Sequence, residues 1–161
     1  MEGFTIISGL ARGIDLEAHI GALEGDGKTI AVLGSSIEKI YPSEHKNIVK
    51  DIILNGAIIS EFSGESPMKK YDLANRNRII ASLSQVSLII EGSLSSGTRH
   101  EVNYAKKLKR QIFALVPKNR EITISQLPLS LIKEGYIPIN SARDVLNNRK
   151  SIKKKDLTSF M

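Results

Sequence analysis

The stretch FTIISGLARGIDLEAHIGAL, residues 4–23, decides the fold of this chain of 161 residues. It starts with a short apolar run of the residue types that favour strands, and two glycines then enclose Arg12 in a turn. The residues after the turn are typical of a short helix with Asp15 at its start. The stretch therefore predicts a strand at 4–8, a tight loop, and a helix at 15–23 whose N-cap is Asp15.

The same alternation of strand and helix continues along the chain. The further predicted strands lie at 29–33, 57–60, 87–90, 111–115 and 136–139. The further predicted helices lie at 43–54, 73–84, 98–108, 125–133 and 141–147. The strands are short apolar runs without polar alternation, which is typical of a parallel sheet that is buried on both faces. Because crossovers between parallel strands are right-handed, we expect a three-layer α/β domain with a doubly wound, mostly parallel sheet.

Composition excludes several classes of protein. No apolar run approaches the roughly 20 residues that span a membrane, and the first residues show no signal-peptide pattern. The chain has no Cys, which excludes disulfide frameworks and thiolate metal sites and fits a cytoplasmic location. The three histidines, His19, His45 and His100, lack the spacing of metal ligands and are expected to be solvated or to cap helices. We therefore predict neither a metal nor a cofactor.

The net charge of +6 is concentrated at one end of the chain. Residues 148–161 contain five Lys or Arg side chains and a single Asp. The expected division is one domain at 1–147 followed by a basic tail at 148–161. Such a tail is usually a solvated terminus and less often an arm that binds phosphate. An argument for nucleic-acid binding must therefore rest on charges that cluster within the domain.

Glycines and small hydroxyl residues follow the predicted strands. They are Ser8-Gly9, Gly34-Ser35-Ser36, Ser60-Glu61 and the run from Glu91 to Thr98. Ligands bind beyond the carboxyl ends of parallel strands, and free amides at helix starts bind anions. The pattern favours a ligand that carries phosphate. The alternative is that tight turns between strands and helices need Gly and Ser in any case.

Two groups of basic residues lie near these turns. Arg12 follows the first strand, where its guanidinium can bind phosphate bidentately or remain solvated. The second group consists of Lys69, Lys70, Arg76 and Arg78. Because Arg76 and Arg78 are two residues apart, they point to different sides of a helix, so one is expected to reach phosphate while the other braces the loop. The alternative is a solvated helix face with one structural ion pair.

Several segments resemble motifs of the DprA/Smf family of bacterial DNA-processing proteins. They are SGLARGIDLEAH at 8–19, KTIAVLG at 28–34, RNRIIASLS at 76–84 and FALVP at 113–117, and the resemblance extends in order over roughly residues 4–147. The resemblance implies a Rossmann-like fold that binds single-stranded DNA. It also implies a role in loading the RecA recombinase during natural transformation, usually as a homodimer, and it implies no catalysis.

The resemblance and the charge pattern together give a set of expected contacts to DNA phosphate, made by side chains and backbone amides. The set is Ser8, Gly9, Arg12, Gly13, Lys69, Lys70, Arg76, Asn77, Arg78, Ser96, Gly97 and Thr98. Two departures accompany it. Leu73-Ala74 stands where the family usually has Phe-Pro, so an aromatic platform for a base is missing there. The chain also starts at what resembles the family's second strand, so the domain is expected to lack the first strand and its phosphate loop.

The segment from Gly97 to Glu101 supports a different function. Its Gly-Thr-x-x-Glu pattern resembles part of the motif of LOG-type nucleotide phosphoribohydrolases, in which a carboxylate assists cleavage of the N-glycosidic bond, although the Pro-Gly-Gly of that motif is absent. Thr98 and Glu101 also fit a capping box at the start of a helix. Two alternatives to DNA binding therefore stay open: a nucleotide hydrolase that uses Glu101, and a nucleotide-binding sensor without turnover.

Overall fold

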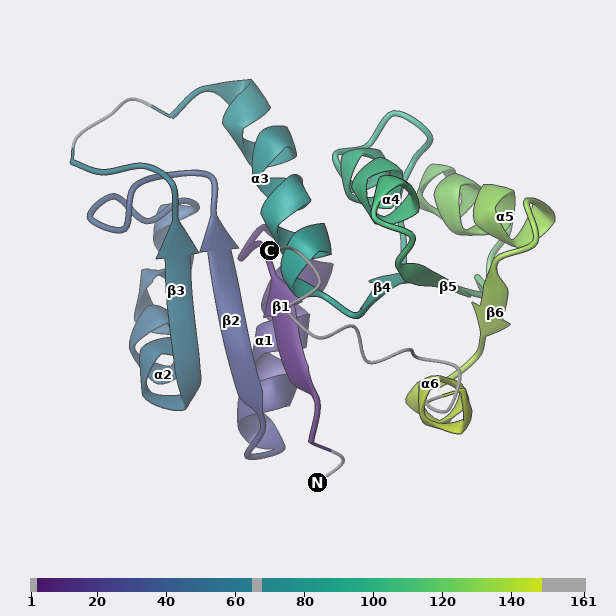
Figure 1. Ribbon diagram of the computed structural model, residues 1–161, viewed down its shortest axis with the longest axis horizontal. Coiled ribbons are helices and arrows are strands. Elements are labelled where there is room, and N and C mark those ends of the chain that lie inside the picture. The colour runs from purple at the N-terminus through teal and green to yellow at the C-terminus, as the bar shows by residue number, and fades with distance from the viewer. Residues whose placement is uncertain (1–2, 65–67, 149–161) are drawn as a thin grey trace. The chain divides into compact units, whose positions relative to one another are not determined.

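A computed structural model describes residues 3–64 and 68–148 (Figure 1). The chain divides into two compact units, the N-terminal unit Met1–Ile80 and the C-terminal unit Ala81–Met161, and each contains a three-stranded parallel sheet. Apart from residue 148, the predicted basic tail lies outside the described residues. In the part of the chain that the structure describes, none of the helices has the length and apolar character needed to cross a bilayer.

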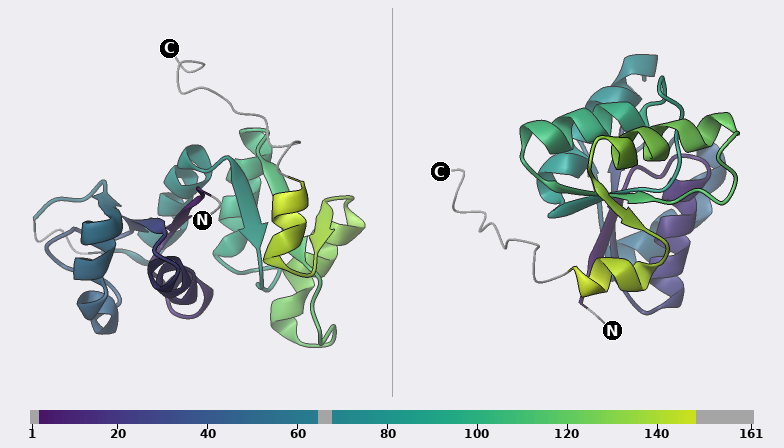
Figure 2. Two further views of the ribbon diagram at one scale, coloured as in Figure 1. Left: turned by 90° about the horizontal axis from the view of Figure 1, so that it is seen from below. Right: turned by 90° about the vertical axis from the view of Figure 1, so that its right-hand side faces the viewer.

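The N-terminal unit alternates strands and helices. Its elements are β1 (Thr5–Ser8), α1 (Ile14–Glu24), β2 (Lys28–Leu33), the 3-10 helix η1 (Ser43–Asn47), α2 (Val49–Asn55), β3 (Gly56–Ser60) and most of α3 (Lys70–Leu83). The strands pair in the order β1-β2-β3, with Ile7 opposite Ile30 and Ala31 opposite Ile58. α1 and α2 contact each other and cover one face of this sheet (Figure 2).

The core of the N-terminal unit lies between the sheet and these two helices. Leu10, Ala31, Leu33 and Ile52 are buried together there. Val32 is buried as well, and it projects from the opposite face of β2. The central strand is thus buried on both faces, which explains why its sequence is continuously apolar.

The C-terminal unit is built in the same way. Its elements are β4 (Val86–Ile89), α4 (Thr98–Lys107), β5 (Gln111–Leu115), the 3-10 helix η2 (Thr123–Ser125), α5 (Gln126–Lys133), β6 (Ile137–Ile139) and α6 (Ala142–Asn147). Its strands pair in the order β4-β5-β6. Successive residues of β5 face opposite sides: Ile112 and Ala114 join a core with residues of α4 and α5, and Phe113 packs with Val145 of α6.

The predicted α/β class with parallel strands is confirmed, and each predicted strand lies within one residue of an observed one. The helices differ more. The segment predicted as one helix at 43–54 is η1 followed by α2. α3 begins at Lys70, earlier than predicted, where the Asp72 carboxylate accepts the Lys69 amide at 2.7 Å and so satisfies a donor at the helix start. Leu83, the last residue of α3, is exposed.

Candidate nucleic-acid interface

The loop at residues 9–13, between β1 and α1, is ordered by Asp15. The Oδ2 atom of Asp15 accepts the amides of Gly9 and Ala11, both at 3.1 Å. α1 has Gly13 at its N-cap position and no side-chain cap. The prediction that Asp15 is the N-cap is therefore wrong, because its carboxylate lies in the first turn and binds the preceding loop. The Gly9 amide, which was expected to meet phosphate, is already used.

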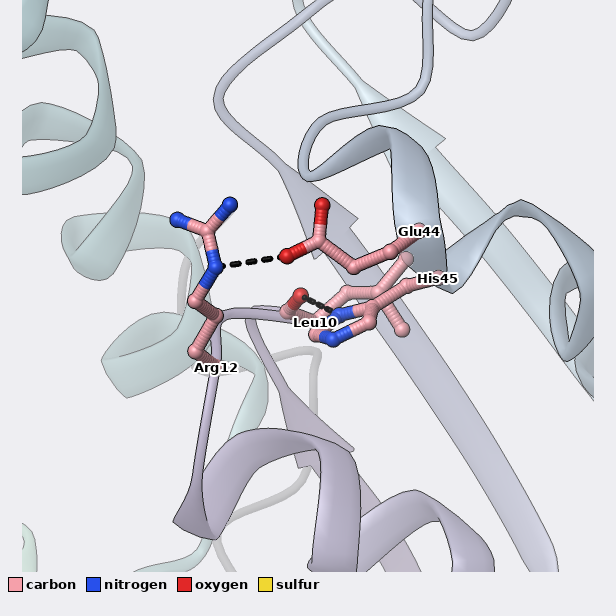
Figure 3. A network of polar contacts seen from close by, with 4 residues as sticks. All are labelled: Leu10, Arg12, Glu44 and His45. Atoms are coloured by element: carbon pink, nitrogen blue, oxygen red, sulfur yellow. Dashed lines mark hydrogen bonds and ion pairs between the residues drawn. The ribbon is translucent and has the colours of Figure 1, made fainter.

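The same loop is held from the side by two adjacent residues of η1. Leu10 has a φ of 59°, in the left-handed region that disfavours residues with a side chain. Nδ1 of the buried His45 donates to the Leu10 carbonyl at 2.8 Å, and the Glu44 carboxylate accepts a hydrogen bond from Arg12 Nε at 2.6 Å (Figure 3). Contacts from Asp15, Glu44 and His45 thus fix this unusual backbone and set the direction of Arg12.

Arg12 lies at the surface, as the sequence predicted. Its side chain is 64% exposed, and its guanidinium carbon is 5.9 Å from the centre of the Tyr41 ring. Hydrogen bonding to Glu44 and then to the Tyr41 hydroxyl raises the pKa of Arg12, and the same contact with Arg12 lowers the pKa of Glu44. Both groups therefore remain charged in neutral solution. In Figure 3 the two terminal nitrogens of Arg12 point away from the loop, and only Nε is joined to Glu44.

Arg76, which was expected near the DNA, is buried. The residue is only 5% exposed. Its Nη1 donates to the carbonyl of Gly9, which follows β1, and to the carbonyl of Val32, the last residue but one of β2. Nε of Arg76 also donates to the Leu73 carbonyl at 3.3 Å. Of the two roles considered for this pair of arginines, Arg76 has that of a brace, because α3 turns this side toward the sheet.

The position of the Arg76 guanidinium requires a glycine at position 9. A Cβ atom on Gly9 would lie 1.9 Å from Nη1 of Arg76 and 2.2 Å from its guanidinium carbon. The glycine therefore admits the guanidinium beneath the loop, whereas the sequence suggested that it admits a phosphate. Gly13 remains exposed at the other end of the loop, and Ser8 is half-buried at the end of β1.

The remaining predicted residues of the N-terminal unit divide between surface and interior. Arg78 is exposed on α3 and forms an ion pair with Glu61, which follows β3. Lys69 is also exposed, and its ammonium lies 5.7 Å from the centre of the Tyr71 ring. Asn77 is buried. Lys70 opens α3, and its side chain lies outside the described part of the structure.

The loop before α4 carries the predicted residues of the C-terminal unit. Gly92 pairs with the η2 and α5 segment, because its amide donates to Ile124 and its carbonyl accepts from Leu127. Ser96 Oγ is buried with no hydrogen-bond partner among the described residues. α4 begins at Thr98, with Gly97 at the N-cap and no side-chain cap. The predicted capping box of Thr98 and Glu101 is therefore wrong, and Glu101 is a half-buried residue of the first turn.

Two histidines that were expected to be solvated or capping are buried instead. His45 binds the Leu10 carbonyl, and the fully buried His19 has its Nδ1 2.6 Å from Oγ1 of Thr29. Burial lowers the pKa of His19 to about 4; the negative charge of Asp15 opposes this shift, and the positive charge of Arg76 adds to it. His19 is therefore neutral at pH 7. Among residues 3–64 and 68–148, no three His, Cys, Asp or Glu side chains form a group that suits a metal ion.

Sequence reasoning missed the residues that build the Arg12 loop. Glu44 and His45 are more than thirty positions away from it, and no periodicity connects them to it. Asp15 carried a signal, since an acid just after a glycine loop is suited to accept loop amides, but the same signal suits a helix cap. The contact of Tyr41 with Arg12 was not predicted either.

Comparison with known proteins relates this architecture to one family. The family model described as DNA recombination-mediator protein A matches residues 1–150. Protein Smf from Escherichia coli is 40% identical over 147 residues, which are 91% of this chain and 39% of the relative. DNA processing protein DprA from Streptococcus pneumoniae is 37% identical over 143 residues, covering 88% of this chain and 50% of the relative. The chain thus spans half or less of the length of these curated relatives.

Two solved structures show the same fold. The structure of DprA from Streptococcus pneumoniae matches with a TM-score of 0.82 and 34% identity, over 91% of this chain and 52% of that one. DNA processing protein A from Helicobacter pylori matches with a TM-score of 0.80 and 28% identity, over 91% of this chain and 66% of that one. The latter structure concerns the single-stranded DNA binding mode of the Helicobacter protein. The expected Rossmann-like fold is thereby confirmed.

Proposed function

Because the chain belongs to the family of DNA recombination-mediator protein A, we propose that it binds single-stranded DNA during DNA processing for recombination. The binding mode reported for the Helicobacter pylori relative supports this proposal. We assign binding without catalysis. The phosphate contacts come from Arg12, Arg78 and Lys69 of the N-terminal unit, which lie after the carboxyl ends of its parallel strands.

The observation that carries the proposal is the state of the two exposed arginines. Each guanidinium is paired with an exposed carboxylate, Arg12 with Glu44 and Arg78 with Glu61. Ion pairs in water contribute little to stability, because solvent screens the charges and the side chains lose freedom. Such a pair keeps the arginine oriented. Its carboxylate partner can be replaced by a phosphate oxygen at a small cost in free energy. Binding of this kind depends on salt and tolerates any base sequence.

Arg76 supports the same surface without touching the ligand. It fixes the carbonyls of Gly9 and Val32, and thereby the loop that carries Arg12. Three other predicted residues lie near it in the chain: Ser8 ends β1, Gly13 precedes α1, and Asn77 follows Arg76 on α3. Ser96, Gly97 and Thr98 of the C-terminal unit, together with Lys70, stay predicted phosphate contacts.

The test is a fluorescence anisotropy titration of labelled oligo-dT at a series of salt concentrations. We expect binding that weakens steeply as salt rises, because each neutralised phosphate contributes about 0.7 to the slope of log affinity against log salt. Arg12→Gln and Arg78→Gln should each weaken binding and lower that slope by about 0.7. Lys28→Gln is the matched control, since Lys28 is an exposed cation of the same unit at the opposite end of β2.

The proposal fails if the wild-type chain does not bind oligo-dT at low salt. It also fails if Arg12→Gln and Arg78→Gln both bind oligo-dT as tightly as the wild type and the Lys28→Gln control. Circular dichroism and thermal unfolding of each variant ensure that lost binding does not come from lost structure. Because Arg12 and Arg78 are exposed, their replacement should leave the unfolding temperature within a few degrees of the wild type.

We further propose RecA as the protein partner, a homodimer as the working form and the cytoplasm as the location, in keeping with the family description as a recombination mediator. Single strands covered by a single-strand binding protein offer a direct test. Adding this chain should shorten the delay before RecA hydrolyses ATP on them, and sedimentation at binding concentrations should give twice the monomer mass. An unchanged delay counts against the RecA role, and a monomer mass counts against the dimer.

A further inference from the structure

Aromatic rings lie beside cations at four places among the described residues. The pairs are Arg12–Tyr41, Lys69–Tyr71, Lys106–Tyr136 and Lys107–Tyr104. Tyr104 and Tyr136 are half-buried and pack against the core of the C-terminal unit. The other two rings are exposed at the surface of the N-terminal unit.

Of the two exposed pairs, Arg12–Tyr41 is the one whose residues are held in place by other parts of the N-terminal unit. Its partners come from separate loops, one after β1 and one after β2, and both loops are tied to η1. Lys69 and Tyr71, by contrast, are two residues apart in one segment. Tyr41 is 39% exposed although it is large and partly apolar, so part of its surface beside Arg12 is accessible to a planar ligand.

The orientation of Arg12 fits this arrangement. Glu44 accepts only the Nε proton, so the edge formed by the two terminal nitrogens is directed away from the loop (Figure 3). That edge is the one that matches two phosphate oxygens. Glu44 is then a positioning residue, which holds the guanidinium by its inner nitrogen, whereas the contact with the Tyr41 hydroxyl can give way to a phosphate oxygen.

From this geometry we propose that Arg12 and Tyr41 bind one nucleotide of a single strand, with the base stacked on the Tyr41 ring and the phosphate bound by the terminal nitrogens of Arg12. A nucleotide carries its base and phosphate on one sugar, and the guanidinium carbon of Arg12 lies 5.9 Å from the centre of the Tyr41 ring, so the two protein groups are neighbours. Stacking on an aromatic ring does not depend on base identity, since every base has a π-face. The inference rests on the proposed DNA binding and adds a base contact to it.

The experiment compares two labelled oligonucleotides of equal length on the full chain, one of oligo-dT and one with abasic sites throughout. The ratio of their affinities measures what the bases contribute. Tyr41→Leu should weaken oligo-dT binding by about 5- to 100-fold and leave the affinity for the abasic strand unchanged. Tyr41→Phe should keep the wild-type ratio, because it keeps the ring. Arg12→Gln should weaken the binding of both oligonucleotides and lower the slope of log affinity against log salt by about 0.7.

The outcomes separate this inference from the proposed function. If the wild type binds oligo-dT but Tyr41→Leu keeps the affinity ratio, the base contact is refuted and DNA binding stands. If the wild type binds neither strand, the proposed function fails, and the inference fails with it. Crosslinking with 5-iododeoxyuridine oligonucleotides gives a second readout that needs no variant. Adducts at Tyr41 support the stacking, and adducts confined to other residues overturn it.

Discussion

The guanidinium of Arg76 lies against the bare Cα of Gly9, and the two residues are joined by a hydrogen bond from Nη1 to the Gly9 carbonyl. This relationship couples α3 to the end of β1. It places a buried positive charge beneath the loop that presents Arg12, with its protons directed at backbone carbonyls. The first two predictions test this arrangement.

Replacing Gly9 by Ala should destabilise the protein by about 2–3 kcal/mol. The new Cβ would lie 1.9 Å from Arg76 Nη1, and the guanidinium cannot move without losing its carbonyl partners. Urea unfolding measures the loss. Gly21→Ala is the control, because a Cβ there meets nothing within 4 Å in the middle of α1 and should stabilise by roughly 0.5–1 kcal/mol. Equal effects at the two glycines would contradict the close packing of Arg76 on Gly9.

Replacing Arg76 by Lys should cost about 2 kcal/mol or more, although it conserves the charge. An ammonium cannot reproduce the planar arrangement that serves the carbonyls of Gly9, Val32 and Leu73, so at least one of them is left without a donor. Thermal unfolding checks this. Arg78→Lys, two residues further along α3 at an exposed ion pair, should change stability by well under 1 kcal/mol. If Arg76→Lys leaves the unfolding temperature unchanged, the hydrogen bonds from the guanidinium to these carbonyls are not needed for stability.

Replacing Asp15 by Ala should destabilise by roughly 2 kcal/mol and weaken oligo-dT binding at the same time. The substitution leaves the amides of Gly9 and Ala11 without their acceptor, so the loop that positions Arg12 loses its support. Glu17→Ala is the matched control, since Glu17 is an exposed acid in the first turn of the same helix. If both variants lose the same stability, the effect belongs to the helix dipole and the loop bonds contribute nothing.

His19 should make the unfolding free energy depend on pH. Its pKa is about 4 in the folded protein and 6.5 in the unfolded chain, so between these values the unfolded chain binds a proton that the folded protein does not. The stabilising contribution is therefore complete above pH 6.5 and is lost as pH falls toward 4, by about 3 kcal/mol at most. Urea unfolding at several pH values should show a shallower dependence in His19→Gln. His100→Gln, at an exposed position, should keep the wild-type dependence.

Local sequence predicted the strands well and the helix caps less well. The strands follow from continuous apolar runs, which only a buried parallel sheet accommodates. The cap assignments failed at Asp15 and Thr98, where residues typical of caps lie inside the first turn. A capping residue is recognised by a side chain that can accept backbone amides, and a carboxylate that serves a neighbouring loop has the same appearance in sequence.

For the candidate site, the sequence by itself determined which residue types gather after the strands: glycines, small hydroxyls and basic side chains. It also determined that Arg76 and Arg78 lie on different sides of α3, because a spacing of two residues fixes that on any helix. Only the tertiary structure decided which of them is buried, since this depends on how α3 packs against the sheet of its own unit. It alone brought Glu44, His45 and Tyr41 to the Arg12 loop, because contacts between residues some thirty positions apart arise from chain packing and leave no local pattern.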